Sequence, residues 1–199
     1  MPLIHECVVT TLSPEGRPHI APLGLIEDQG YWIAAPFRPS STLFNLTHNP
    51  RATASFTDDA RIFAGLVVGQ RNWPLTDIED WPAPRLSAAL AHAELVVARV
   101  EEHEVRPRFF CRVRRIESHR AFLGMNRARA AVLEAAILAT RLDMLPREKI
   151  ESELAYLQIA IDKTAGDAER EAWDMVMAKI DAHQRAPGRP SHKKRSALP

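Results

Sequence analysis

The stretch ECVVTTLSPEGRPHIAPLGLIEDQGYWIAA, residues 6–35, decides the fold class. Residues 6–12 are rich in Val and Thr, which favours a β-strand, and the Pro and Gly of residues 13–16 predict a turn. Residues 17–26 alternate as a second strand, and residues 27–30 turn the chain into a third strand at 31–35. Two hairpins in succession predict an antiparallel β-meander.

The next eighty residues are expected to extend this sheet. A short helix is predicted over 42–47, with Ser40 or Ser41 as its cap and Pro50 beyond its end. Further strands are predicted at 52–56, 62–68, 94–100 and 109–116, with the last two paired. Residues 71–86 are rich in Pro and Trp and are expected to be irregular.

Beyond Ser118 the apolar period changes to that of a helix. An alanine-rich helix is predicted over 126–144, a second begins at Pro146, and Thr164-Ala165-Gly166-Asp167 has the form of a capping box that opens a third. The expected fold is therefore α+β, with a six-to-seven-stranded antiparallel barrel followed by a three-helix subdomain. We place the barrel at residues 1–120, the helices at 121–182 and a disordered basic tail at 183–199.

Charge separates the tail from the rest of the 199-residue chain. Residues 183–199 hold five Arg or Lys and no acid, while the whole chain has a net charge of +1. The preceding residues therefore carry a net charge of −4, which makes a nucleic-acid-binding body unlikely. The tail is either a solvated terminus or a segment that makes weak contacts with RNA, DNA or an acidic partner.

Several function classes lose support from the sequence. No run approaches the roughly 18–20 apolar residues of a membrane helix, and the N-terminus lacks the pattern of a signal peptide. Cys7 and Cys111 form no CxxC pair, so we expect reduced thiols in a cytoplasmic protein. Dinucleotide-binding, P-loop, HExxH and GxSxG motifs are absent, and no metal site is expected.

The loop before the first predicted helix is the best candidate for an anion site. Arg38 precedes the hydroxyl residues Ser40, Ser41 and Thr42, and Asn45 follows within the helix. Free N–H groups, hydroxyls and the positive end of a helix dipole together favour a phosphate. The alternative is that these hydroxyls merely cap the helix.

Two segments resemble a known group of proteins. The order of Thr10-Thr11, the His19–Gly24 strand and Ser41-Thr42-Leu43-Phe44-Asn45-Leu46 resembles FMN-binding split barrels, in whose reductase members an Asp-Thr-x-x-Asn-Ile motif has an acid in the place of Ser41. The segment from Gly124 through Asn126-Arg127-Ala128 to Glu134-Ala135 is similar to the signature of the flavoprotein family called domain of unknown function 447. This resemblance spans residues 4–182.

The resemblance implies a homodimer that holds FMN in a groove between two protomers. Ser41, Thr42 and Asn45 would face the phosphate or ribityl chain, with Arg38 as the nearby cation. The remaining implied cofactor-binding residues are Thr10 and Thr11, the backbone of Ala21, Pro22, Leu23 and Gly24 along the isoalloxazine edge, and Asn126 and Arg127 at the start of the alanine-rich helix.

Arg127, Glu134 and Arg141 are spaced by seven residues and form one stripe of that helix. The stripe is either a solvent-exposed ion-pair face or a set of arginines that reaches the flavin or an anionic substrate.

The resemblance favours an FMN-dependent oxidoreductase that acts on a small molecule. The metabolic setting in which the family occurs implies a pterin or related C1 carrier as that molecule. The alternatives are a non-catalytic flavin-binding or sensor module and a structural dimer without flavin. No side chain stands out as a catalytic acid or base, which is compatible with chemistry that resides in the flavin.

Overall fold

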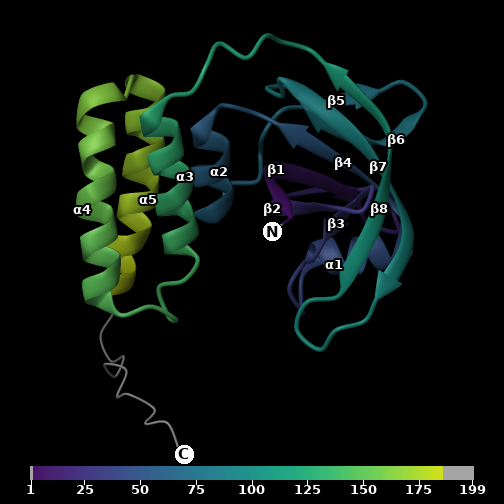
Figure 1. The fold of residues 1–199 in the computed structure, drawn as a ribbon, viewed down its shortest axis with the longest axis horizontal. Coiled ribbons are helices and arrows are strands. Elements are labelled where there is room, and N and C mark those ends of the chain that lie inside the picture. Colours follow the sequence, from purple (N-terminus) through teal and green to yellow (C-terminus); the bar gives the residue numbers. More distant parts are fainter. Residues whose placement is uncertain (1, 186–199) are drawn as a thin grey trace, which may run out of the picture. The chain divides into compact units, whose positions relative to one another are not determined.

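The computed structural model describes residues 2–185, which form two compact units. The barrel unit comprises residues 2–59 and 70–124, and the helical unit comprises residues 60–69 and 125–185. Figure 1 shows the strands of the first unit and the helices of the second. The predicted tail beyond residue 185 lies outside the described residues.

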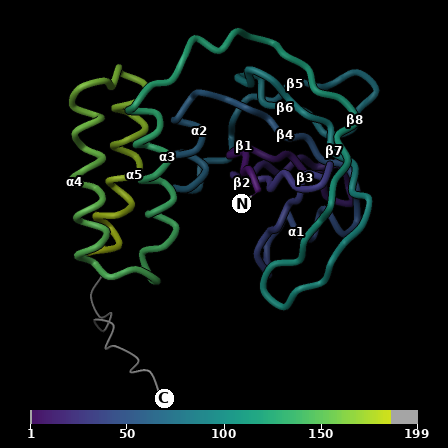
Figure 2. The backbone as a smooth tube through the Cα atoms, in the orientation of Figure 1, coloured from purple at the N-terminus to yellow at the C-terminus, as the bar shows by residue number. Residues whose placement is uncertain are grey.

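Six antiparallel strands close the barrel in the order β1-β2-β3-β8-β7-β4. They are β1 (Leu3–Leu12), β2 (Pro18–Asp28), β3 (Tyr31–Ala34), β4 (Arg51–Phe56), β7 (Ala91–Glu101) and β8 (Arg108–Ser118). Figure 2 traces the long hairpin that β7 and β8 form. The predicted antiparallel barrel and the pairing of the last two strands are confirmed.

The meander is paired unevenly. β1 and β2 pair along their whole length, from Leu3↔Glu27 to Leu12↔Pro18. β2 and β3 meet at the two-residue turn Gln29-Gly30, both with positive φ, and their ladder ends at Ile26↔Ile33. Within the described residues, β2 from 18 to 25 is therefore paired only with β1, and we call its other side, which pairs with no strand, the free edge. Arg71 Nη1 donates to the Ile20 carbonyl of this stretch at 2.9 Å.

Inward-facing residues of the strands fill the barrel. Val9, Leu25 and Leu95 are at most 1% exposed, and the two cysteines lie in the same cluster. Burial raises the pKa of the Cys111 thiol to about 12 and that of Cys7 well above its ordinary value. Both thiols are therefore protonated and unreactive in the folded protein.

The proline-rich segment expected to be irregular is a two-stranded sheet of β5 (Leu75–Ile78) and β6 (Trp81–Leu86). It packs on the outer face of the barrel, where Thr53 Oγ1 donates to the carbonyl of Ala83 at 2.6 Å and accepts from Trp81 Nε1 at 2.9 Å. A two-stranded sheet has free edges, and this is where strands accept proline. The prediction of an irregular segment was wrong because prolines usually indicate that a strand is absent, whereas here they occur within a short hairpin.

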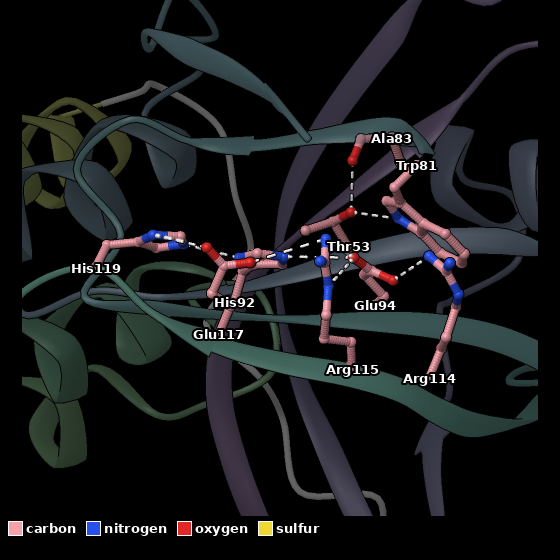
Figure 3. Close-up of polar contacts among 9 residues, drawn as sticks. All are labelled: Thr53, Trp81, Ala83, His92, Glu94, Arg114, Arg115, Glu117 and His119. Atoms are coloured by element: carbon pink, nitrogen blue, oxygen red, sulfur yellow. Dashed lines mark hydrogen bonds and ion pairs between the residues drawn. The ribbon is translucent and has the colours of Figure 1, made fainter. Parts of the chain in front are cut away.

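A buried carboxylate lies on the same outer face. Glu94 of β7 is 0% exposed, and its two oxygens accept hydrogen bonds from Arg114 Nη1 at 2.7 Å and Arg115 Nε at 2.8 Å. Glu94 pairs with Arg115 while Leu95 pairs with Val113, so Arg114 is the extra residue of a β-bulge. The bulge lets two successive arginines reach one carboxylate, as Figure 3 shows.

The strand predicted at 62–68 is wrong, because these residues belong to α2 (Ala60–Val67) of the helical unit. Ala60, Ala64 and Val67 are spaced by four and three residues and pack against α3 (Arg127–Ala139) and α5 (Asp167–Arg185). The period of a short continuous apolar run does not distinguish a buried strand from a buried helix. Here the residues form a helix because one of its faces packs against the other helices of the unit. The predicted domain boundary at residue 120 therefore omits one helix of the helical unit.

The other helices of this unit are α3 (Arg127–Ala139), α4 (Arg147–Thr164) and α5 (Asp167–Arg185). The three helices match the predicted subdomain. α3 ends five residues earlier than predicted, because the chain turns at Thr140 and brings Leu142 and Leu145 against the helical core. α5 extends through residues 183–185, which were assigned to the tail. None of the described helices is long and apolar enough to cross a membrane.

The predicted capping box at 164–167 is wrong. Thr164 is the last residue of α4, and its hydroxyl donates to the carbonyl of Ala160 at 2.8 Å. The carboxylate of Glu169 instead accepts from the Gly166 N–H at 3.1 Å and from Arg129 Nε at 2.9 Å. Burial alone raises the pKa of Glu169, but these hydrogen bonds outweigh it and lower the pKa below its ordinary value.

Candidate functional site

A groove lies in the barrel unit where the β1–β2 turn meets the start of α1 (Ser41–His48), and we call it the α1 groove. Its volume is about 690 Å³. The residues that line it are Ser13, Glu15, Arg17, Pro18, His19, Pro39, Ser40, Ser41, Phe44 and Asn45. Hydroxyl, guanidinium and imidazole groups therefore face one space at the N-terminus of a helix.

Ser40 is the residue that caps α1. Its backbone is extended, and its Oγ accepts the Leu43 N–H at 3.2 Å. Ser41 is the first helical residue, is exposed and lines the groove, so its hydroxyl is available to a ligand. The first-turn N–H groups and the helix dipole favour an anion at this position.

The loop before α1 is held by the β7–β8 hairpin. The Arg38 N–H donates to the carbonyl of Val105 at 2.9 Å, and Arg106 Nε donates to the carbonyl of Ala35 at 2.8 Å. The Arg38 guanidinium pairs with Glu102 at 2.6 Å. These contacts anchor the loop that precedes α1 to the β7–β8 hairpin.

A buried hydrogen bond holds α1 against β1. Asn45 is 3% exposed, and its Nδ2 donates to Thr11 Oγ1 at 2.9 Å. The two residues are 34 positions apart, so this contact fixes the helix relative to the strand. The structure thus brings together Thr11, Asn45 and Ser41 of the predicted set.

The charges at the mouth of the groove belong mainly to the β1–β2 turn. A hydrogen bond from Ser13 is the main reason that the pKa of Glu15 is lowered, and Arg17 lies 3.9 Å from the same carboxylate. Burial, with a smaller contribution from Arg71, lowers the pKa of His19, so this imidazole is neutral at pH 7. Arg17 is the cation that lines the groove and is largely exposed.

The predicted backbone segment 21–24 lies on the free edge of β2. These four residues are half-buried and pair with β1 on their other side, from Ala21↔Val9 to Gly24↔Glu6. A Cβ on Gly24 would approach Ile4 Cγ2 to 2.8 Å, so a larger residue here would have to displace the Ile4 side chain. The free edge offers backbone donors and acceptors to a flat ligand.

The other predicted site residues do not line the α1 groove. Thr42 is buried within α1, and Arg38 is turned toward Glu102. Thr10 shares the outer face with its partner Thr53, and its buried hydroxyl has no hydrogen-bond partner. Asn126, which caps α3, and the exposed Arg127 belong to the helical unit.

Sequence reasoning missed Ser13, Arg17 and His19 as groove residues. The available signal was the position of the turn, which lies between the strand that ends in Thr11-Leu12 and the strand that carries Ala21–Gly24. Within residues 2–185, no group of His, Cys, Asp and Glu side chains is arranged to hold a metal ion.

A six-stranded antiparallel barrel with one free strand edge beside a hydroxyl-rich helix start is a split β-barrel. A solved structure described as an FMN-bound protein of Methanosarcina mazei is similar to this chain, with a TM-score of 0.76 and 19% identity over 90% of this chain and 96% of that one. The 2-nitrobenzoate 2-nitroreductase of Pseudomonas fluorescens has a TM-score of 0.50 and 18% identity over 60% and 66% of the two chains. At such identities the likeness shows the fold alone.

Two family models match the chain. The model described as the N-terminal domain of the protein of unknown function DUF447 matches residues 5–120, and the second DUF447 model matches residues 126–178. The chain therefore belongs to the DUF447 family, which confirms the resemblance drawn from the segment around Asn126. None of the curated proteins matches significantly.

Proposed function

We propose that this protein binds FMN in the barrel unit, with the phosphate in the α1 groove and the ring along the free edge of β2. The observation that carries the proposal is the α1 groove, in which Ser41, Arg17 and the start of a helix face one space. The FMN-bound state of the Methanosarcina mazei relative supports the same cofactor.

The groups in the groove fit a phosphate monoester. Hydroxyl groups, backbone N–H groups and a guanidinium are the donors that bind phosphate in proteins. Glu15 is the one carboxylate in the lining, and Ser13 and Arg17 already engage it. The amide edge of a flavin ring matches the unpaired backbone groups of β2, which alternate as donors and acceptors along the strand.

Bound FMN would supply hydride and electron transfer, and the chain would supply binding, orientation and electrostatics. In this proposal Ser41 and Arg17 hold the phosphate, and Asn45 keeps α1 in place against β1. We assign the protein to the oxidoreductases that act on a small molecule, with a pterin or C1-carrier compound as the class that the family resemblance implies.

A second copy of the chain completes the proposal. Phe44, which lines the groove, is 53% exposed, and Phe37, in the loop before α1, is 57% exposed. Exposed aromatic side chains next to a free strand edge favour association. We therefore propose a homodimer in which the partner covers this region.

Replacing Ser41 with Ala tests the phosphate assignment. A hydrogen bond to a charged group contributes about 1.5–3 kcal/mol, so FMN should bind roughly tenfold to a hundredfold more weakly to the variant. Riboflavin lacks the phosphate, and its affinity should not change. Fluorescence titration measures both constants.

Thr47→Ala is the matched control, because the Thr47 hydroxyl donates to the Leu43 carbonyl near the other end of the same helix. This variant should bind both flavins as the wild type does. Equal losses of FMN and riboflavin affinity in Ser41→Ala would remove the phosphate from this groove. Flavin that binds but is not bleached by NADH or NADPH without oxygen would favour the non-catalytic alternative.

A further inference from the structure

Two histidines of the barrel unit share a hydrogen bond away from the α1 groove. His92 of β7 is 1% exposed, and its Nδ1 lies 2.8 Å from Nε2 of His119, just beyond β8. The two rings are parallel within 4°. Figure 3 shows this pair beside the Glu94 cluster. Because both atoms are ring nitrogens, one carries the proton and the other accepts it.

The surroundings decide which nitrogen carries the proton. His92 Nε2 is buried without a hydrogen-bond partner, and Glu94 Oε1 lies 3.8 Å from it. A carboxylate repels a lone pair and attracts an N–H, so buried Glu94 favours a proton on His92 Nε2. Glu117, 4.0 Å from His119 Nδ1, favours the opposite tautomer, but its side chain is half-exposed and Arg85 affects His119 more strongly. We therefore assign the proton of the neutral His92 ring to Nε2. Its Nδ1 is then the acceptor, and His119 Nε2 is the donor. His119 Nδ1 is left unprotonated.

His119 links this pair to the surface. Its side chain is 16% exposed and lines a cavity of about 580 Å³, together with Ser118, Arg120, Phe122, Leu90 and Ala91. The N–H groups of His119 and Arg120 both donate to the Leu90 carbonyl, at 2.7 and 3.1 Å. We call this cavity the β8 groove, and it shares no lining residue with the α1 groove.

The charges around the β8 groove are mainly positive. Arg120 lines it, and Arg85 of β6 lies close enough to lower the pKa of His119, although burial is the larger cause. The opposing carboxylate is Glu117, whose Oε1 lies 4.0 Å from His119 Nδ1 and which is itself 3.8 Å from Arg115. Burial also lowers the pKa of His92, so the pair is neutral at pH 7.

A pair of apolar side chains would fill the same space without the cost of burying two imidazoles. The pair instead leaves an unprotonated nitrogen at a groove that has cations around it. We propose that the β8 groove is a second ligand site, which takes a small oxyanion such as a carboxylate or a sulfate-like group and couples its binding to the uptake of one proton by the histidine pair.

The proton enters at His119 Nδ1 and comes from solvent. It turns His119 into an imidazolium whose N–H is directed to the anion, while Glu94 stabilises the positive charge through the His92 ring. Burial and Arg85 lower the pKa of His119, and the negative charge of the bound anion counteracts both effects, so it raises the pKa of the pair. Affinity is therefore greatest at pH values below the free pKa and is lost as the pH rises through the bound pKa.

Sulfate is a suitable probe, because its charge is constant between about pH 5 and 8. Nitrogen–proton NMR spectra of the histidine rings of the full chain report the tautomer and the protonation of each ring. We expect sulfate to shift the His92 and His119 signals, to raise the pKa of the pair, and to bind more tightly as the pH falls.

His119→Gln should weaken sulfate binding at least tenfold at low pH and abolish its pH dependence, while His48→Gln, an exposed position on α1, should not. An unchanged near-UV spectrum of the His119→Gln protein shows that the barrel is intact. Sulfate that leaves both ring signals unmoved, or that binds His119→Gln as it binds the wild type, would overturn the proposal. Shifts confined to His19 would place sulfate in the α1 groove instead, and would also overturn it.

Discussion

A protein in which both Arg114 and Arg115 are replaced by Met should lose far more stability than one in which Glu94 is replaced as well. Glu94 is completely buried, and these two arginines are its hydrogen-bond donors. Without them a carboxylate is left uncompensated in the interior. Such a stranded charge costs about 3–5 kcal/mol of unfolding free energy.

The triple variant with Glu94→Met should recover most of that loss, because an apolar residue of similar volume often replaces a buried ion pair at little cost. Urea unfolding of the wild type, the double variant and the triple variant measures the difference. A triple variant as unstable as the double variant would show that the arginines act by packing on Trp81 instead, where Arg114 lies 5.5 Å from the ring centre.

Asn45→Ala should weaken both the fold and the flavin site. The substitution removes the buried hydrogen bond to Thr11 and leaves the Thr11 hydroxyl without its amide donor, at a cost of about 1–3 kcal/mol. Because this bond positions the start of α1, FMN affinity should fall more than tenfold. Thermal unfolding and fluorescence titration measure the two effects.

Thr47→Ala serves again as the control on the same helix and should leave both quantities near their wild-type values. An Asn45→Ala protein with normal FMN affinity but reduced stability would separate α1 from the flavin site. Normal stability with reduced affinity would mean that the amide contacts the cofactor directly.

Much of the barrel follows from local sequence. The turn residues at 13–16 and 27–30 define the meander, and the structure has positive φ at Gly16 and Gly30. The N-terminal cap of α1 could be predicted because serines precede an apolar helical turn, and Ser40 is the residue that provides this cap. Such features depend on a few neighbouring residues, and for that reason they can be read without tertiary information.

Features that depend on tertiary packing were missed. Residues 62–67 form a helix because the helical core takes one face of it, and residues 75–86 form a hairpin because Thr53 and Trp81 tie it to the barrel. Arg38 faces Glu102, which is 64 positions away, so local sequence did not reveal its partner. The alternation Ala91-His92-Ala93-Glu94 is a pattern that would place His92 and Glu94 on one face of a strand, and it could have indicated the buried cluster.

Native mass spectrometry of the purified full chain, before and after incubation with excess FMN, tests the central claim most directly. The proposal predicts the mass of two chains with one FMN for each, and a flavin absorbance spectrum that accompanies it. The released cofactor should be FMN, with its phosphate retained. A chain that gains no flavin mass even with excess FMN would contradict the account.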